Sequence, residues 1–307
     1  RFVLNPFTGG EFSVCVMDSD LVGTMFGSAA AGLLARICFH PVDTAKAKIQ
    51  CQGGVARSAP GMVFDVWKAY GVAELYRGFG ITACGAIPAT CLYFTTYTAC
   101  RDVLGPVVPS AFLTDFSAGF IAEAVSCVLW VPIDVTKEQL QTQMELKTTQ
   151  HTGSWNAVQN IVRERGVPGL YRGYGATLAS FGPFSALYFM FYEQIRYMAA
   201  VPQDSSGGAW LGTCLSAAAA GGAAAFLTNP LDLVKLRLQV QSRGEGLMEG
   251  RTAYQYPTFM AGLRHIWATE GIRGAYRGAA ARVWFQAPST ALTMATMESF
   301  KQWYLGH

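Results

Sequence analysis

Three stretches of the 307-residue chain share one pattern, in which an apolar run ends in a proline, an acid two residues later and a lysine three residues after the acid. The three motifs read HPVDTAKAKIQ, VPIDVTKEQLQTQ and NPLDLVKLRLQVQ. Each apolar run has about 20 residues, which is enough for a helix to cross the hydrocarbon core of a bilayer. A pattern repeated at this spacing predicts three similar units, each built around a membrane-spanning helix.

Each motif is followed by an amphipathic stretch, the tripeptide YRG and a second apolar run. The predicted fold is therefore all-α and integral to the membrane, with six transmembrane helices in three tandem hairpins that form a pseudo-threefold bundle with short surface helices. We expect an N-terminal extension at 1–19 and repeats at 20–105, 106–203 and 204–307. The predicted spans are roughly 20–50, 79–101, 112–142, 174–196, 208–240 and 279–302.

Composition supports a membrane protein, because 51% of the residues are hydrophobic and only 14% are charged. Most of the 23 Lys and Arg residues fall between a motif lysine and the following YRG, so the three long loops should lie on one side of the membrane. The net charge of +3 is not gathered into a block, and we expect no nucleic-acid partner. The eight cysteines have no metal-ligand spacing, and we expect neither a metal nor a cofactor.

Three PxDxxK motifs in register, each followed by YRG, resemble the mitochondrial carrier family over essentially the whole chain. The resemblance implies a multi-pass protein of the mitochondrial inner membrane that moves a small molecule by alternating access, with its surface helices on the matrix side. It also implies a monomer. We do not expect an enzyme, since no cluster of nucleophile, base and orienting residue recurs in the loops.

The motif proline should kink each odd-numbered helix and draw the three helix ends together. Charges at membrane depth need partners, so the acids and lysines should pair between neighbouring helices. The resemblance implies the pairs Asp43–Lys137, Asp134–Lys235 and Asp232–Lys46 as a matrix gate, with a glutamine bracing each pair: Gln50, Gln141 and Gln239. The alternative is a set of ordinary salt bridges that hold a static bundle.

A second gate is implied at the cytoplasmic end, where the family places an aromatic residue, an acid and a base on each even-numbered span. The candidates are Tyr97, Arg101, Tyr192, Glu193, Arg196, Glu298 and Lys301. Thr98 stands where the second span should carry its acid. Only Glu193–Lys301 and Glu298–Arg101 can then pair, and we predict that the resting carrier is open toward the cytosolic side.

The YRG elements have two interpretations. They can be aromatic and basic anchors at headgroup depth, or, as the resemblance implies, helix starts that bind cardiolipin phosphates. The candidate lipid-binding residues are Gly71, Arg77, Gly78, Gly166, Arg172, Gly173, Gly271, Arg277 and Gly278. The family often has an acid before the first glycine; here only Glu270 keeps it, and Tyr70 and Arg165 depart from it.

Substrate contacts are expected about two turns into each even-numbered helix, seven and eight residues after the YRG glycine. These positions are Gly85, Ala86, Ser180, Phe181, Phe285 and Gln286. None of them is charged, which argues against a substrate with several negative charges.

Ionisable residues inside spans are candidates for function, and three stand out: Arg36, Glu123 and Arg282. Arg36 could hold a carboxylate and Glu123 an ammonium or sulfonium group, which favours a zwitterionic, amino-acid-like solute. The helix around Glu123 is similar in part to that of S-adenosylmethionine carriers, which usually have a base where Trp130 stands and an Arg-Glu pair where Ser180 and Phe181 stand. Arg36 and Glu123 could instead pair with each other, and Arg282 is expected to support the matrix gate. A proton-leak uncoupler and a scaffold without transport remain alternatives of the same fold.

Overall fold

The computed structural model describes residues 20–51, 58–146, 151–199, 207–241 and 256–305. Within these residues the chain is helical, with turns and no strand, which confirms the all-α prediction. The long helices are α1 (Asp20–Cys51), α4 (Phe79–Leu104), α5 (Ala111–Leu146), α7 (Tyr174–Met198), α8 (Gly207–Leu227), which is followed by α9 (Asn229–Val240), and α12 (Ala279–Leu305).

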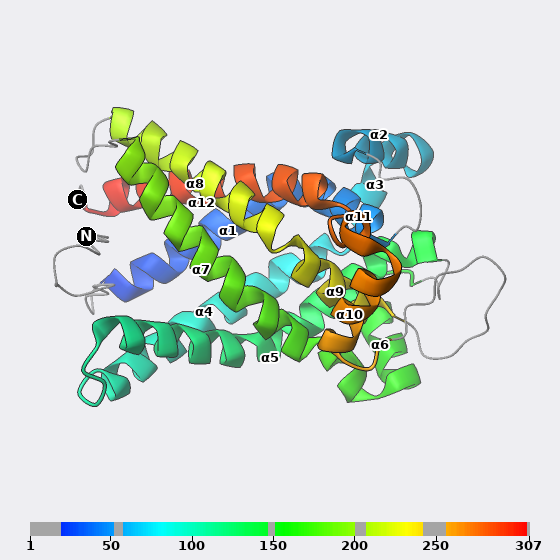
Figure 1. Cartoon of the computed structure of the whole chain (residues 1–307), viewed down its shortest axis with the longest axis horizontal. Coiled ribbons are helices and arrows are strands. Elements are labelled where there is room, and N and C mark those ends of the chain that lie inside the picture. The colour runs from blue at the N-terminus through cyan, green and yellow to red at the C-terminus, as the bar shows by residue number, and fades with distance from the viewer. Residues whose placement is uncertain (1–19, 52–57, 147–150, 200–206, 242–255, 306–307) are drawn as a thin grey trace.

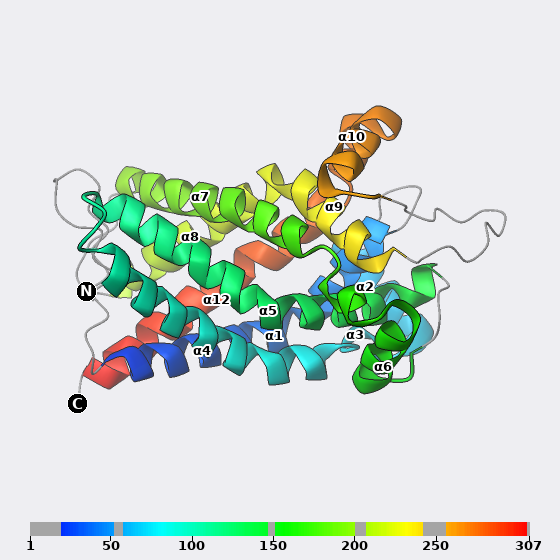
Figure 2. The same cartoon turned by 90° about the horizontal axis from the view of Figure 1, so that it is seen from below.

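The long helices form a closed ring, because each packs against the next along the chain and α12 packs against α1. The start of α1 and the end of α12 lie at the same end of the bundle (Figure 1), and the view turned by 90° agrees (Figure 2). The shorter helices gather at the opposite end. They are α2 (Ala59–Tyr70), α3 (Val72–Leu75), α6 (Ser154–Arg165), the 3-10 helix η1 (Val167–Tyr171), α10 (Phe259–Thr269) and α11 (Gly271–Ala275).

The motif prolines act differently in the three repeats. Pro41 and Pro132 lie inside α1 and α5, which continue through them. In the third repeat the helix stops at Leu227, and Pro230 lies in the first turn of a new helix. Proline has no N–H to donate and crowds the carbonyl four residues earlier, so a helix start is the position where it disturbs least. The span predicted over 208–240 is therefore two helices.

Three helical segments are long and apolar enough to cross a membrane by length and composition, namely Val72–Leu104, Leu113–Met144 and Trp210–Leu227. Within the described residues, the other long helices contain no stretch that is both apolar enough and poor enough in charged residues to meet the same criterion. Helix α7 shows why, since Tyr188, Tyr192, Glu193 and Arg196 interrupt its apolar residues.

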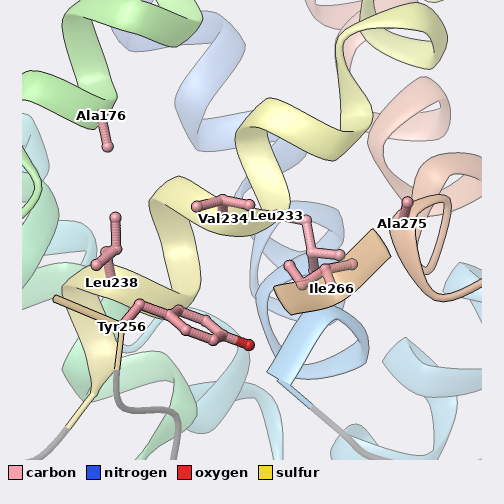
Figure 3. Close-up of a cluster of buried hydrophobic side chains, with 7 residues drawn as sticks. All are labelled: Ala176, Leu233, Val234, Leu238, Tyr256, Ile266 and Ala275. Carbon is pink, nitrogen blue, oxygen red and sulfur yellow. The ribbon is translucent and has the colours of Figure 1, made fainter. Parts of the chain in front are cut away.

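Aromatic side chains of α4 and α7, the second and fourth spans, pack on small residues of the helices that follow them, α5 and α8. Tyr97 of α4 packs against Ala118 and Ala122 of α5, and Tyr192 of α7 packs against Ala217 and Ala220 of α8. Small residues allow helix backbones to approach closely in lipid. Near the short helices, α9 contributes to a separate buried cluster with α7, α10 and α11 (Figure 3), made of Ala176, Leu233, Val234, Leu238, Tyr256, Ile266 and Ala275.

Candidate functional site

The six charged residues of the PxDxxK motifs meet at the end of the bundle where the short helices gather. Nζ of Lys137 lies 2.5 Å from Oδ2 of Asp43. Nζ of Lys46 lies 2.7 Å from Oδ2 of Asp232. The third pair is Lys235 and Asp134, with 2.9 Å between Nζ and Oδ2. These are the pairings expected from the sequence, and each joins two different repeats.

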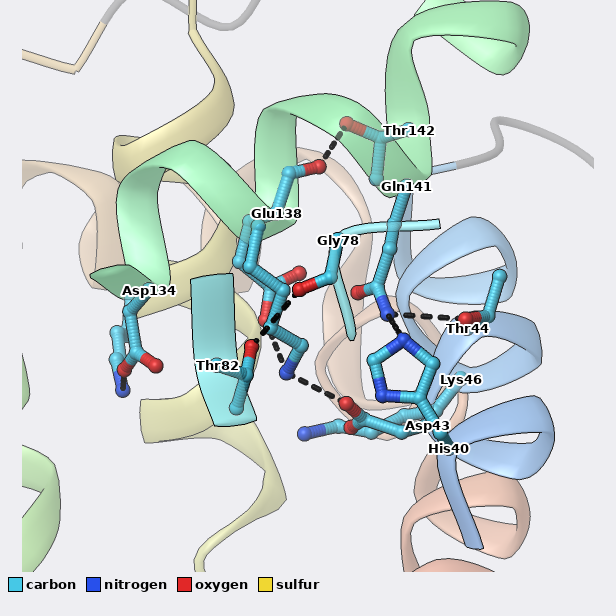
Figure 4. A network of polar contacts seen from close by, with 12 residues as sticks. His40, Asp43, Thr44, Lys46, Gly78, Thr82, Asp134, Glu138, Gln141 and Thr142 are labelled. Atoms are coloured by element: carbon cyan, nitrogen blue, oxygen red, sulfur yellow. Dashed lines mark hydrogen bonds and ion pairs between the residues drawn. The ribbon is translucent and has the colours of Figure 1, made fainter. Parts of the chain in front are cut away.

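Two further charged residues belong to this ion-pair ring. Nε of Arg282 lies 3.4 Å from Oδ2 of Asp232, and its Nη1 donates to the carbonyl of Ala225. Arg282 thus supports the ring, the place expected for it. Glu138 follows Lys137 in the chain, and its carboxylate lies 3.6 Å from Nζ of Lys137 (Figure 4). Sequence reasoning did not single out Glu138, because its position in the motif carries no fixed residue.

The three glutamines differ from the expectation that each braces an ion pair. Nε2 of Gln50 donates to Oδ2 of Asp232 at 3.2 Å, so this glutamine does contact its pair. Nε2 of Gln141 instead donates to the Thr44 hydroxyl at 2.9 Å and approaches Nε2 of His40 at 3.4 Å. Nε2 of Gln239 has no hydrogen-bond partner within the described part of the chain. Thr44 and His40 are nearer partners than the ion pair for Gln141.

Each YRG glycine lies against a residue in or just after the PxDxxK motif of another repeat. A Cβ added to Gly278 would come within 2.7 Å of Cγ of Gln50, and one added to Gly173 would come within 3.0 Å of Cγ of Gln239. Gly278 also has a φ of 77°, in the left-handed region that favours glycine. The glycine therefore serves close packing on the ion-pair ring, besides any contact with lipid.

The YRG arginines make ion pairs that differ between repeats. In the third repeat, Glu270 pairs with Arg237 of α9 and with Arg277. Burial raises the pKa of Glu270, but the hydrogen bond and charge of Arg237, with the charge of Arg277, outweigh it and hold that pKa below its usual range. The acid before the first glycine is thus a bridge between an odd-numbered helix and the YRG turn.

The first repeat keeps this bridge although Tyr70 stands in place of the acid. Glu74, one turn later, lies 3.5 Å from Nζ of Lys48 and 2.8 Å from Nη1 of Arg77. The sequence comparison of motifs missed this residue, because the acid moved by four positions while keeping the same partners.

The described contacts of the second repeat are different. Its arginines, Arg165 and Arg172, both donate to the carbonyl of Gln241, at 3.1 and 3.3 Å. A cavity of about 240 Å³ opens beside Arg172 at the start of α7. The residues around it include Arg172, Gly173, Tyr256 and Thr258.

A second cavity, of about 220 Å³, lies partway along the bundle. It is lined by Thr90, Tyr93, Glu123, Trp130 and Phe181. Cys127 donates to Oε1 of Glu123 at 3.5 Å. Sequence reasoning identified Glu123 and Phe181 and missed Thr90 and Tyr93, which lie outside the expected contact positions.

Arg36 lies next to this cavity. Its guanidinium sits over the Trp130 ring, 4.7 Å from the centroid. No ion pair between Arg36 and Glu123 occurs in the described structure, so the alternative in which they neutralise each other does not hold in this conformation.

The other expected contact positions lie mostly in helix packing. A Cβ added to Gly85 would overlap the Ile133 side chain. Ala86 and Ser180 are buried, and the Ser180 hydroxyl donates to the carbonyl of Ala176. Phe285 and Gln286 are half-buried on α12.

At the cytoplasmic end, part of the expected gate falls outside the described residues, namely the side chains of Glu298 and Lys301. Arg196 lies over the Tyr192 ring, 5.7 Å from its centroid. Oε1 of Glu193 is buried with no hydrogen-bond partner among the residues that the structure describes. Nε of Arg101 lies 3.1 Å from Oδ1 of Asp115, an acid of α5 that the motifs did not point to.

Comparison with known proteins agrees with this architecture. A family model described as "Mitochondrial carrier protein" matches residues 18–107, 108–200 and 207–307. Mitochondrial substrate carrier family protein E of Dictyostelium discoideum is 34% identical over 300 residues, which cover 92% of this chain and 96% of that protein. The mitochondrial S-adenosylmethionine carrier protein of Xenopus laevis is 29% identical over 267 residues, covering 86% and 90%. Mitoferrin of Dictyostelium discoideum is 29% identical over 289 residues, covering 90% and 92%.

The family model covers nearly the whole chain in three consecutive matches, and each match contains one PxDxxK motif and one YRG. The chain therefore belongs to the mitochondrial carrier family, as a multi-pass transporter of the mitochondrial inner membrane.

Proposed function

We propose that this transporter moves a zwitterionic, amino-acid-like solute, with S-adenosylmethionine as the first candidate, and that it works as a monomer by alternating access. The observation that carries the proposal is the cavity in which Glu123 lies beside Trp130 and Phe181, with Arg36 stacked on the same tryptophan.

The cavity offers complementary groups for the two ends of such a solute. The Glu123 carboxylate suits an ammonium or sulfonium group, and the aromatic faces around it add a cation–π attraction. Arg36 can leave the Trp130 face to hold a carboxylate. A guanidinium matches a carboxylate with two parallel hydrogen bonds.

The ion-pair ring supplies the matrix-side barrier to this movement. Its three pairs are formed at 2.5 to 2.9 Å, and these contacts support the proposal that this end is closed in the conformation described. Desolvation offsets much of the attraction in a buried pair. The ring is therefore weak enough for a bound solute to open, provided that the solute binds the open state more tightly.

The relatives support the substrate class only in part. Several are named S-adenosylmethionine carriers, and others of similar identity are named mitoferrins. The substrate panel of any transport assay therefore includes S-adenosylmethionine, neutral and cationic amino acids and Fe²⁺. Proton flux measured in the same vesicles addresses the uncoupler alternative.

Uptake into liposomes containing the purified protein tests the proposal. Arg36→Ala and Glu123→Gln should each abolish uptake of the solute while the protein stays folded. Asp102→Asn, an exposed acid of α4, is the matched control and should transport normally. Unchanged uptake in both cavity variants would refute the substrate assignment.

We also propose that the cavity at the start of α7 binds a cardiolipin phosphate. Arg172 lies at its wall, the start of α7 presents N–H groups with the favourable end of the helix dipole, and the start of α10 adds a second helix N-terminus. Added cardiolipin should raise the unfolding temperature of the wild type more than that of Arg172→Gln. An equal rise in both would refute this site.

A further inference from the structure

Asp115 is an acid near the start of α5 that meets two side chains of α4. Its Oδ1 lies 3.1 Å from Nε of Arg101 and accepts a hydrogen bond from the Tyr97 hydroxyl at 3.2 Å. Asp115 and Tyr97 are each only 7% exposed. The cluster lies at the cytoplasmic end, remote from the ion-pair ring.

The cluster involves the one even-numbered span whose gate motif lacks its acid. Thr98 stands there, and its hydroxyl donates to carbonyls of its own helix, those of Phe94 and Thr95. Arg101, the base of the same motif, pairs with Asp115, an acid of the next repeat. Seventeen residues before the other motif prolines the chain has Thr24 and Thr213, so only the second repeat carries an acid at this position.

A buried carboxylate is costly unless donors surround it. Within the described residues, Arg101 and Tyr97 are the donors to Asp115, and its Oδ2 receives no hydrogen bond. The contact therefore holds the guanidinium against the α4–α5 wall in a conformation whose matrix end is closed. In the cytoplasmic gate expected from the sequence, Arg101 pairs with Glu298 of α12 when that end closes.

We propose that Asp115 is a positioning residue of the transport cycle, which retains Arg101 on the α4–α5 wall while the cytoplasmic end is open and so competes with closure of that end. This inference rests on the proposed alternating-access function. Its specific content is that one arginine is shared between two acids, Asp115 in the cytosol-open state and Glu298 in the matrix-open state.

The variant Thr90→Cys, which places a cysteine in the cavity that contains Glu123, can report the state of the carrier. The native cysteines are first replaced, and a membrane-impermeant maleimide is added to mitoplasts, which expose the cytosolic side, or to inverted inner-membrane vesicles, which expose the matrix side. The ratio of the two labelling rates measures the balance between cytosol-open and matrix-open protein.

Asp115→Asn should lower this ratio about fivefold, the upper end for an ion pair that water still reaches. Asp115→Glu should restore most of the ratio, and Asp102→Asn, the exposed neighbour of Arg101, should leave it unchanged. Asp115→Asn should also lose its effect in a Glu298→Gln background, because the acid proposed to compete with Asp115 for Arg101 is then removed. A purely structural role would lower stability without moving the ratio.

An unchanged ratio in Asp115→Asn, with the wild type labelled from both sides, would overturn this inference and leave alternating access intact. If the wild type and every variant are labelled from one side only, with S-adenosylmethionine present or absent, alternating access itself fails and the inference fails with it.

Discussion

Replacement of Glu74 tests whether its ion pairs stabilise the first repeat as those of Glu270 stabilise the third, although Glu74 lies one turn later in the motif. Glu74 lies within 3.5 Å of Lys48 and 2.8 Å of Arg77. Lys48 is fully buried, whereas Arg77 is 25% exposed at its side chain. Removing the acid therefore breaks an ion pair whose cation, Lys48, is fully buried.

The expected loss in the free energy of unfolding follows from that difference in burial. Breaking a buried ion pair by removing one partner costs about 3–5 kcal/mol. Water can still reach Arg77, so we take the lower end, about 3 kcal/mol, for Glu74→Gly. With about 2–4 °C per kcal/mol for a chain of a few hundred residues, the unfolding temperature should fall by about 6–12 °C.

The informative variant restores the pattern of the third repeat. In Tyr70→Glu/Glu74→Gly the acid stands before Gly71 and a glycine stands one turn later, as Glu270 and Gly274 do. Glycine matters there, because a Cβ at Gly274 would overlap the Glu270 side chain. The double variant should recover most of the lost stability in a thermal unfolding assay of the purified protein.

Asp102→Ala on the exposed face of α4 is the control for loss of an acid and should unfold at the wild-type temperature within a degree or so. The reasoning is refuted if the double variant is no more stable than Glu74→Gly. It is also refuted if Glu74→Gly unfolds together with Asp102→Ala.

Three further outcomes follow from the same geometry. The pKa of Glu270 is held below its usual range, so its bridge stabilises the fold above the ordinary glutamate pKa of about 4.3 and is lost as the pH falls through the lowered value. Glu270→Gln should therefore unfold at a lower temperature than the wild type at pH 7, and this difference should disappear below about pH 4. A difference in unfolding temperature that is the same at every pH would contradict this. Gly278→Ala should lower the unfolding temperature, because its Cβ would press on Gln50 at a φ of 77°, whereas Gly80→Ala, where an added Cβ meets nothing within 4 Å, should not. Gln50→Ala should increase matrix-side labelling of Thr90→Cys more than Gln239→Ala does, since within the described residues Gln50 contacts an ion pair and Gln239 does not, and equal effects would show that this contact is unimportant.

The repeated features of the fold were predictable from the sequence. The three motifs predict where the odd-numbered helices cross and which charges can meet, because the same residues recur at the same spacing. The structure brings Asp43 to Lys137, Asp134 to Lys235 and Asp232 to Lys46. Their role as a gate stays a proposal.

The features that differ between repeats were not predictable in this way. Pro230 lies in the first turn of a new helix, whereas Pro41 and Pro132, in the same motif, lie inside continuous helices. Beside it, the buried Asn229 side chain donates to the carbonyls of Ala275 and Arg277, contacts that lie far along the chain. Asp115 falls outside every repeated motif, and only the packing of α4 on α5 brings it to Arg101.

Exchange of one ion pair tests the central claim, that the ring closes the matrix end. Asp134→Lys and Lys235→Asp each place like charges together at a contact of 2.9 Å, and the double variant restores opposite charges across the same two helices. We predict that each single variant increases labelling of the Thr90 cysteine in inverted inner-membrane vesicles and that the double variant returns it toward the wild-type rate. Single variants that label like the wild type, or a double variant that labels like the singles, would contradict the account.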